Sequence, residues 1–272
     1  MDRYAVIGHP VEHSLSPRIH EAFADQTAAA MVYGRIDPGP EGFSEAARAF
    51  FAEGGMGLNV TVPFKAQAYS FASALSERAE CAGVVNTLIR SSAGSIRGDN
   101  TDGIGLVRDL TTHLGLTLAG QRILLVGAGG AVRGALAPLL ETAPAEVVVA
   151  NRTAARAEAL ARDFAALGPV HGGGLTLEAT GNAFDLVING SAASLGGQVP
   201  ALDPAVIGDD CTVYDMMYGP AASAFLDWGR QHGAARIADG LGMLVEQAAE
   251  SFYLWRGLHP DTAPVLAGLR GA

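Results

Sequence analysis

Lys65 is the only lysine in this chain of 272 residues; lysine and arginine together number 18, so the other 17 are arginine. A lysine ammonium can have its pKa moved by its surroundings and can then give or take a proton, whereas a guanidinium stays protonated at any working pH. The single amine therefore predicts proton-transfer chemistry at position 65. The ordinary alternative is a surface lysine at the start of a helix, but a cation there opposes the helix dipole, and arginine would serve as well.

A predicted strand just before this lysine places two polar groups on one face. Side chains alternate along a strand, so Asn59 and Thr61 point away from the face that carries the apolar residues. An exposed strand face explains this pair without any function, and a binding face is the alternative. The apolar residues of the other face are Leu58, Val60 and Val62.

Two further polar stretches, EHSLSP at 12–17 and GDNTDG at 98–103, have an explanation in helix capping. Ser16 stands where an N-cap residue would precede a proline at the first helical position, whereas Ser14 is less easily explained. Thr101 or Asp102 could cap the helix that follows the second stretch, which lacks the spacing of a calcium-binding loop. Capping alone therefore leaves Ser14 without a role.

The sequence GAGGAVRG at 127–134 follows a buried apolar run and opens a helical pattern. In this setting, backbone amides and a helix N-terminus can hold a pyrophosphate. The G-x-G-x-x-G pattern is incomplete, because Gly127 and Gly129 are present but Val132 occupies the third glycine position. A tight strand-to-helix connection without a ligand is the alternative.

The next predicted strand ends in Asn151, Arg152 and Thr153, where an NAD site usually has an acidic residue for the ribose diol. An arginine stands there instead, and Arg156 follows four residues later. Planar guanidinium groups can bind a 2′-phosphate through paired hydrogen bonds, so the pattern favours NADP over NAD. A solvated arginine pair on the first turn of a helix is the alternative.

Taken in order, the motifs SLSP, NVTVPFK, GVVNT, GDNTDG, GAGGAVRG, NRT, YDMMY and GLGMLVEQ resemble the shikimate dehydrogenase family over almost the whole chain. Single motifs are weak, but NVTVPFK followed by NTDG and GAGGA at these separations is specific. The resemblance implies NADP-dependent, reversible reduction of 3-dehydroshikimate to shikimate by hydride transfer, in the biosynthesis of chorismate and the aromatic amino acids. It implies no metal.

The resemblance also implies a role for each matching residue. Lys65 would lie beside the reacting centre as the catalytic group, together with Asp102. The substrate-binding positions would be Ser14, Ser16, Asn59, Thr61, Asn86, Tyr218 and Gln247. The cofactor-binding positions would be Gly127, Gly129, Gly130, Ala131, Asn151, Arg152, Thr153, Arg156, Met217 and Gly240, although core packing also explains Met217.

One stretch departs from the family pattern, and two rival functions stay open. INGSAASLGG, from Ile188, stands where the family more often has Asn-Ala-Thr-Ser, in a loop expected near the cofactor. A quinate or aminoshikimate dehydrogenase of the same family would keep Lys65 and Asp102 but alter the carboxylate-side hydroxyls or the cofactor arginine. A sensor that binds NADPH and a ring acid without turnover would have no need of a proton-transfer pair.

These residues need an α/β fold of two domains to position them. Short strands alternate with helices through the first hundred residues, and from about residue 120 apolar strands alternate with helices or long connections, which is typical of an open parallel sheet. We expect an α/β substrate domain at 1–101, a Rossmann-type NADP domain at 102–238 and a helical segment at 239–272 that returns to the first domain. The family places the active site in the cleft between the two domains.

Composition excludes several other classes of protein. A formal charge of −10 without clusters of basic residues argues against a nucleic-acid surface, and the apolar run near the N-terminus is too short for a signal peptide or a membrane span. Cys81 and Cys211 are far apart and lack metal-type spacing, which fits a reducing compartment. We expect a cytoplasmic protein, monomer or homodimer, whose partner is a small molecule.

Overall fold

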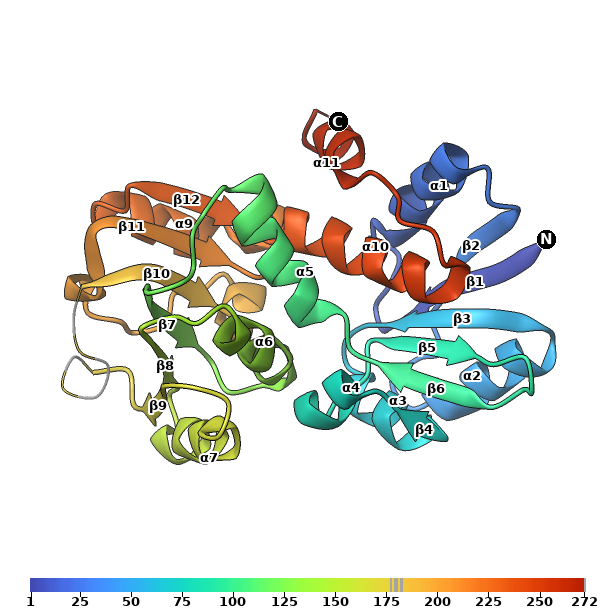
Figure 1. The fold of residues 1–272 in the computed structure, drawn as a ribbon, viewed down its shortest axis with the longest axis horizontal. Coiled ribbons are helices and arrows are strands. Elements are labelled where there is room, and N and C mark those ends of the chain that lie inside the picture. The colour runs from blue at the N-terminus through green and yellow to red at the C-terminus, as the bar shows by residue number, and fades with distance from the viewer. Residues whose placement is uncertain (177, 179–180, 182, 272) are drawn as a thin grey trace. The chain divides into compact units, whose positions relative to one another are not determined.

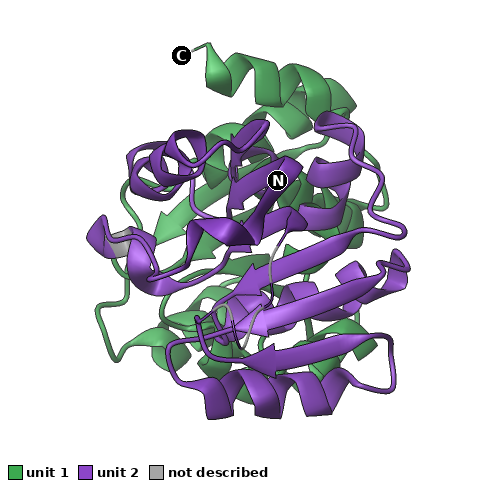
Figure 2. Ribbon diagram, turned by 90° about the vertical axis from the view of Figure 1, so that its left-hand side faces the viewer, with its two compact units in different colours: residues 1–105, 244–272 green, residues 106–243 purple. Residues whose placement is uncertain are grey.

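The computed structural model describes residues 1–176, 178, 181 and 183–271, which form two compact units (Figures 1 and 2). The first unit contains residues 1–105 and 244–272, and the second contains residues 106–243. The boundaries fall inside two helices, α5 (Asp102–Arg108) and α10 (Leu241–Arg256). The last 29 residues of the chain, 244–272, thus belong to the same unit as the first 105.

The first unit is built on a mixed six-stranded sheet with the order β2-β1-β3-β5-β6-β4. Strand β1 pairs in parallel with β2 and β3, whereas β5 is antiparallel to both β3 and β6. Its strands are β1 (Asp2–Ile7), β2 (Met31–Ile36), β3 (Gly55–Val60), β4 (Ala74–Leu75), β5 (Thr87–Arg90) and β6 (Ile96–Asp99). Its other helices are α1 (Ser16–Thr27), α2 (Phe43–Ala52), α3 (Lys65–Phe71), α4 (Glu77–Ala82) and α11 (Thr262–Arg270).

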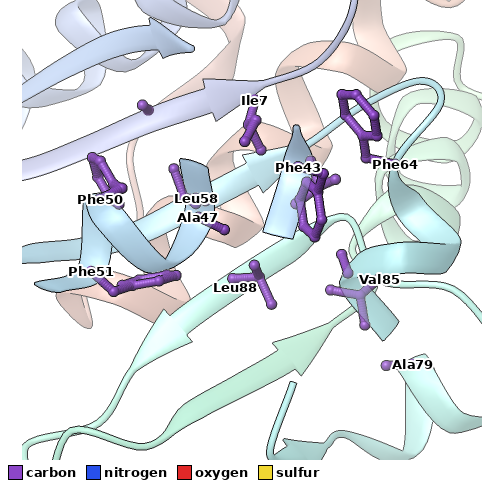
Figure 3. Close-up of a cluster of buried hydrophobic side chains, with 13 residues drawn as sticks. Ile7, Phe43, Ala47, Phe50, Phe51, Leu58, Phe64, Ala79, Val85 and Leu88 are labelled. Atoms are coloured by element: carbon purple, nitrogen blue, oxygen red, sulfur yellow. The ribbon is translucent and has the colours of Figure 1, made fainter. Parts of the chain in front are cut away.

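An aromatic cluster packs against one face of this sheet (Figure 3). Phe43 of α2 stacks on Phe64 with ring centroids 5.4 Å apart, and both rings are buried with Leu58 of β3. Val62 was expected on this apolar face but is 59% exposed, so that expectation is wrong. Strand β3 ends at Val60, and a turn in which the Phe64 N–H donates to the Thr61 carbonyl brings Phe64 into the core instead.

The second unit contains a six-stranded sheet with the order β12-β11-β10-β7-β8-β9, in which every pairing is parallel. The central strands are nearly continuous apolar runs, as expected for strands covered on both faces. Its strands are β7 (Arg122–Val126), β8 (Glu146–Ala150), β9 (Val170–Gly173), β10 (Phe184–Asn189), β11 (Ile207–Asp215) and β12 (Arg236–Asp239). The α-helices that lie wholly within its described residues are α6 (Gly130–Glu141), α7 (Ala154–Phe164) and α9 (Ser223–Gln231), besides a π-helix, η1 (Asp109–His113), and three short 3-10 helices, η2 (Ala192–Gly196), η3 (Pro204–Val206) and η4 (Gly219–Ala221).

The parallel sheet confirms the expected fold class and adds two strands to it. The sequence predicted β7, β8, β10 and β11 but not β9 and β12, which lie at the two edges of the sheet. Their sequences, VHGG and RIAD, are too short and too polar to show an apolar run. Among the described residues, no helix is long and apolar enough to cross a membrane.

Candidate active site

Lys65 and Asp102 form an ion pair in the first unit. The Lys65 Nζ lies 2.5 Å from the Asp102 Oδ2, and the two side chains are 25% and 7% exposed. Each residue begins a helix directly after a strand and a short turn, Lys65 in α3 and Asp102 in α5. An ammonium at a helix start gains nothing from the helix dipole, so its carboxylate partner is what holds it there. The residues predicted to carry the chemistry are therefore brought together.

Asn86 holds the second oxygen of that carboxylate. Its Nδ2 donates to the Asp102 Oδ1 at 2.8 Å and to the Thr101 Oγ1 at 2.9 Å. Its Oδ1 in turn accepts the Thr101 N–H and the Thr87 hydroxyl, both at 2.9 Å. Both carboxylate oxygens of Asp102 thus accept hydrogen bonds from side-chain donors.

Helix α10 contributes Gln247 and Ser251 to the same network. The Gln247 Oε1 lies 3.3 Å from the Asn86 Nδ2, and its Nε2 donates to the Leu244 carbonyl at 2.7 Å. Ser251 is four residues later, on the same face of the helix, and its hydroxyl donates to the Gln247 carbonyl at 3.0 Å. Residues far apart in sequence therefore share one buried polar cluster.

Asn59 lies inside this cluster, so the exposed-face explanation is wrong for it. The residue is only 6% exposed. Its Nδ2 donates to the Ser251 Oγ at 2.9 Å and to the Thr87 Oγ1 at 3.3 Å. Its Oδ1 accepts the Tyr33 hydroxyl at 2.8 Å and faces the His20 Nε2 at 3.2 Å. Thr61, two residues later, is half-buried.

Ser14 and Ser16 contact each other, but the expected N-cap role of Ser16 is wrong. Helix α1 begins at Ser16 itself, with Leu15 in the N-cap position and no side-chain cap. The Ser14 Oγ accepts the Ser16 N–H at 3.3 Å and donates to the Ser16 Oγ at 3.2 Å. Proline lacks an N–H, and the second helical position tolerates it because an N–H there would have no partner within the helix. Pro17 therefore did not fix the start of α1.

The capping expectation for GDNTDG is corrected in a similar way. Asn100, not Thr101 or Asp102, accepts the Asp102 N–H through its Oδ1, at 3.1 Å. This arrangement leaves the Asp102 carboxylate to Lys65 and Asn86.

The glycine turn of the second unit has the geometry of a phosphate loop. Gly127 follows β7 with φ +116°, and a Cβ there would stand 3.1 Å from the Gly190 backbone. Gly129 is the N-cap of α6, and a Cβ there would meet no described atom within 4 Å. The fold itself explains the glycine at 127, while the open space at 129 suits a close-lying pyrophosphate. Gly130 and Ala131 begin the helix whose N-terminus faces this turn.

Val132, in the third glycine position, packs against Gly190 in the loop that departs from the family pattern. Val132 is fully buried, and a Cβ on Gly190 would stand 2.7 Å from its Cγ2. The third glycine normally permits close packing of helix and strand. Here the missing side chain at 190 supplies the room.

Arg152 and Arg156 are exposed at the carboxyl end of β8 and the start of α7. Neither makes a side-chain hydrogen bond or ion pair within the described part of the chain. Asn151 is partly buried and donates to the Thr153 carbonyl at 3.0 Å. Two cations at a helix N-terminus oppose the helix dipole. An anion bound there would be stabilised by the arginine charges and by the dipole.

Met217, Tyr218 and Gly240 lie together in the second unit. The Gly240 N–H donates to the Met217 carbonyl at 2.9 Å, and a Cβ on Gly240 would stand 2.2 Å from the Met216 carbonyl oxygen. The Met217 N–H donates to the Asp215 Oδ1 at 2.8 Å. Tyr218 is partly exposed, and burial of its ring raises the pKa of its hydroxyl.

Asp215 was not singled out from the sequence, although it holds this loop. It is fully buried, and burial raises its pKa. Hydrogen bonds from Ser194, the Met217 N–H and Asn189 act in the opposite direction but are the smaller effect. The Ser194 hydroxyl and the Asn189 Nδ2 both bond the Asp215 Oδ2, at 2.6 and 2.9 Å. These hydrogen bonds tie the loop that departs from the family pattern to the end of β11, just before Met217.

Four side chains of the first unit's network were also missed: His20, Tyr33, Thr87 and Ser251. Helical spacing could have found two of them, since His20 is four residues after Ser16 and Ser251 is four residues after Gln247. Thr87 is opposite Asn59 in the antiparallel pair of β3 and β5, which only the register shows.

Three segments of the chain match known families. Residues 6–88 match the shikimate dehydrogenase substrate binding domain, residues 109–194 match shikimate/quinate 5-dehydrogenase, and residues 240–270 match the shikimate 5′-dehydrogenase C-terminal domain. The matched segments include parts of both units described above.

Full-length relatives agree with these matches. The shikimate dehydrogenase (NADP(+)) of Aeromonas salmonicida is 55% identical over 99% of this chain and 98% of its own. The structure is similar to that of Thermus thermophilus shikimate 5-dehydrogenase in complex with NADP(H) and shikimate, with a TM-score of 0.87, 31% identity and 99% of each chain covered. It is also similar to an Ael1 enzyme from Pseudomonas putida, with a TM-score of 0.92, 44% identity and coverage of 99% and 98%.

Proposed function

The chain belongs to the shikimate dehydrogenase family, and from that premise we propose that it reversibly reduces 3-dehydroshikimate to shikimate with NADPH, a step of chorismate and aromatic amino acid biosynthesis. The observation that carries the mechanism is the Lys65–Asp102 pair, partly open on the ammonium side and held by Asn86 on the other. When bound, NADPH supplies the hydride. The chain's own residues must then bind the ring acid and provide the proton.

Lys65 is the proton donor in the direction of ketone reduction. As hydride adds to the carbonyl carbon, the C=O electron pair moves to oxygen, and the Lys65 ammonium gives that oxygen its proton. In the oxidation of shikimate, the neutral amine takes the hydroxyl proton as hydride leaves. Asp102 orients the ammonium through one oxygen, and its second oxygen accepts from Asn86.

Hydroxyl and amide groups would bind the rest of the substrate. Ser14 and Ser16 offer two hydroxyls in contact, suited to a carboxylate, and Asn86 and Gln247 lie beside Asp102, suited to ring hydroxyls. A site built to hydrogen-bond a hydroxyl strongly rejects analogues that lack it, because its polar groups would be left unpaired. Thr61 and Tyr218 are the other two residues of the proposed set.

The second unit fits NADP. The α6 N-terminus and the open space at Gly129 suit the pyrophosphate. Arg152 and Arg156, whose side chains pair with no other described residue, suit the 2′-phosphate. Met217 and Gly240 would border the nicotinamide. The Asp215 carboxylate holds Met217 by accepting its N–H, and the Met217 carbonyl in turn accepts the Gly240 N–H. We assign the substrate role to the first unit and the NADP role to the second; the oligomeric state, monomer or homodimer, and a cytoplasmic location stay predictions.

The test is turnover by the purified protein, followed by the absorbance of reduced nicotinamide. We expect shikimate with NADP to be the best pair among shikimate and quinate with NADP and NAD. Faster turnover of quinate would select the quinate rival, and binding of both ligands without turnover would select the sensor.

A further inference from the structure

His20 is a buried titratable group that the proposed chemistry does not use. It is fully buried in α1, and burial lowers its pKa to about 3, against a hydrogen bond with Asn59. Its ring stacks on Tyr33 with centroids 4.2 Å apart and planes 8° apart, and Trp255 and Phe252 lie nearby. The ring is therefore neutral at any working pH and fixed in orientation.

The surroundings of Asn59 decide which way its amide points. Three oxygens surround its Nδ2: the Ser251 Oγ, the Thr87 Oγ1 and, at 3.5 Å, the Asn86 carbonyl, which can only accept. The Thr87 hydroxyl has the Asn86 Oδ1 as an acceptor at 2.9 Å, and the Ser251 hydroxyl has the Gln247 carbonyl at 3.0 Å. The two hydroxyls also lie 2.8 Å apart, so one of them can donate to the other, and in each of these arrangements neither proton points to Asn59. The NH₂ group of Asn59 must therefore face these oxygens.

The amide oxygen of Asn59 then faces two groups that must both donate. One is the Tyr33 hydroxyl at 2.8 Å, and the other is the His20 Nε2 at 3.2 Å. His20 is consequently in the tautomer that carries its proton on Nε2. Its Nδ1 is left as a buried acceptor without a hydrogen-bond partner among the described residues, which is the remaining cost of this arrangement.

Asn59 in turn connects two groups of proposed substrate ligands. On one side, Tyr33 hydrogen-bonds both Asn59 and Ser16. On the other side, the Thr87 hydroxyl accepts from Asn59 and donates to Asn86, and Asn86 donates to Asp102. One chain of directed hydrogen bonds thus runs from the serine pair to the catalytic carboxylate.

Resting on the proposed function, we propose that His20 is a positioning residue: its Nε2–H fixes the Asn59 amide and, through it, the substrate-binding hydrogen bonds of Asn86 and Ser16. His20 touches neither Lys65 nor Asp102 in any contact of the described network. It acts by removing the alternative amide orientation, in which the Thr87 hydroxyl would donate to Asn59 and Asn86 would lose that hydrogen bond.

A matched pair of substitutions tests this role. His20→Gln keeps an N–H near the position of Nε2, and His20→Met puts an unbranched chain of the same length there without a donor. We expect His20→Met to lower kcat/KM for shikimate about tenfold, the scale of a buried acceptor losing its donor, and His20→Gln to stay within about threefold of wild type. KM for NADP should be unchanged in both.

Equal losses in the two variants would assign His20 to packing alone, and an unchanged kcat/KM in His20→Met would remove it from the pocket. Either result overturns the proposal. Tyr33→Phe removes the other donor to the same oxygen, so its effect should be non-additive with that of His20→Met.

Long-range ¹H–¹⁵N NMR of the wild-type protein checks the tautomer without any variant or turnover. We expect a neutral ring protonated on Nε2, and protonation on Nδ1 would overturn the inference whatever the substrate is. Wild-type protein that fails to oxidise shikimate would instead count against the proposed function, so the two failures are distinguishable.

Discussion

At the scale of single residues, the side chains that matter are those whose hydrogen bonds have a fixed direction. Asp102 accepts from both Lys65 and Asn86, and Asn86 is oriented in turn by Thr87 and Thr101. The sequence could identify Lys65, because its residue type is unique in the chain. It could not identify Tyr33 or His20, because neither type is unusual and their contacts arise only from packing.

We predict that lowering the pH decreases the unfolding free energy of the wild-type protein more than that of the His20→Gln variant. The pKa of His20 is about 3 in the folded protein against an ordinary 6.5 when unfolded, so between these values the unfolded chain binds a proton that the folded chain does not. Stability therefore rises with pH in this range, by about 1.4 kcal/mol per pH unit. Between about pH 4.5 and pH 7, His20 should account for roughly 2 to 3 kcal/mol of unfolding free energy.

Urea unfolding of both proteins at several pH values measures this difference directly. Contributions from the carboxylates cancel in the comparison, because both proteins contain the same set. Parallel curves for wild type and His20→Gln would contradict the neutral, buried state of this ring.

We predict that Arg152→Ala weakens NADP roughly tenfold to hundredfold and leaves NAD nearly unchanged, because it removes a charge-assisted phosphate contact. Arg162→Ala is the matched control: it deletes the same charge from the last turn of the same helix, α7, and should change neither cofactor. Fluorescence titration with each cofactor gives the dissociation constants. Equal weakening of NAD and NADP by Arg152→Ala would refute the 2′-phosphate assignment.

We predict that Ser14→Ala and Ser16→Ala both raise KM for shikimate. Their effects on stability should differ, because Ser14 accepts the first N–H of α1 whereas Ser16 provides no cap. Ser14→Ala should cost about 0.5 to 1 kcal/mol, the scale of a modest hydrogen bond. Steady-state kinetics and thermal unfolding check the two parts; an unchanged KM in both variants would take the serines out of the substrate site.

At the scale of elements, close approaches fix the loops that border the cofactor turn. Gly190 makes room for Val132 of α6, and Asp215 ties the 190–197 loop to the end of β11. The sequence predicted α6 and the four inner strands because each has a clear apolar pattern. It missed the short edge strands and the exact start of α1, where local patterns are compatible with more than one boundary.

We predict that Gly190→Ala destabilises the protein by about 1 to 3 kcal/mol, because the new methyl group meets Val132, whose branched side chain has little rotamer freedom in a helix, and the Met216 Sδ. Val132→Ala should relieve the part of this cost that comes from Val132, so the double variant should be more stable than the sum of the single effects. Gly129→Ala is the control: it faces open space and should lower NADP affinity with little change in stability. Thermal unfolding decides, and additive losses would contradict the packing account.

At the scale of the whole molecule, two sheets of different kinds carry the two sets of residues. The mixed sheet carries the Lys65–Asp102 network, and the parallel sheet carries the glycine turn and the arginines. Periodicity could predict both sheets because it is local. The network could not be predicted from it, because it joins α1, β3, β5 and α10, and the pairing of Asn59 with Ser251 spans 192 positions of the chain.

The proton-donor role of Lys65 requires an amine at position 65 that can exchange a proton, and kcat of Lys65→Arg measures this requirement. The substitution keeps a positive charge beside Asp102 but makes proton transfer unavailable. We expect kcat to fall at least about a hundredfold, with much smaller changes in the affinities for shikimate and NADP. A kcat within about threefold of wild type would show that only charge is needed there, and would contradict the assignment of Lys65 as the proton donor.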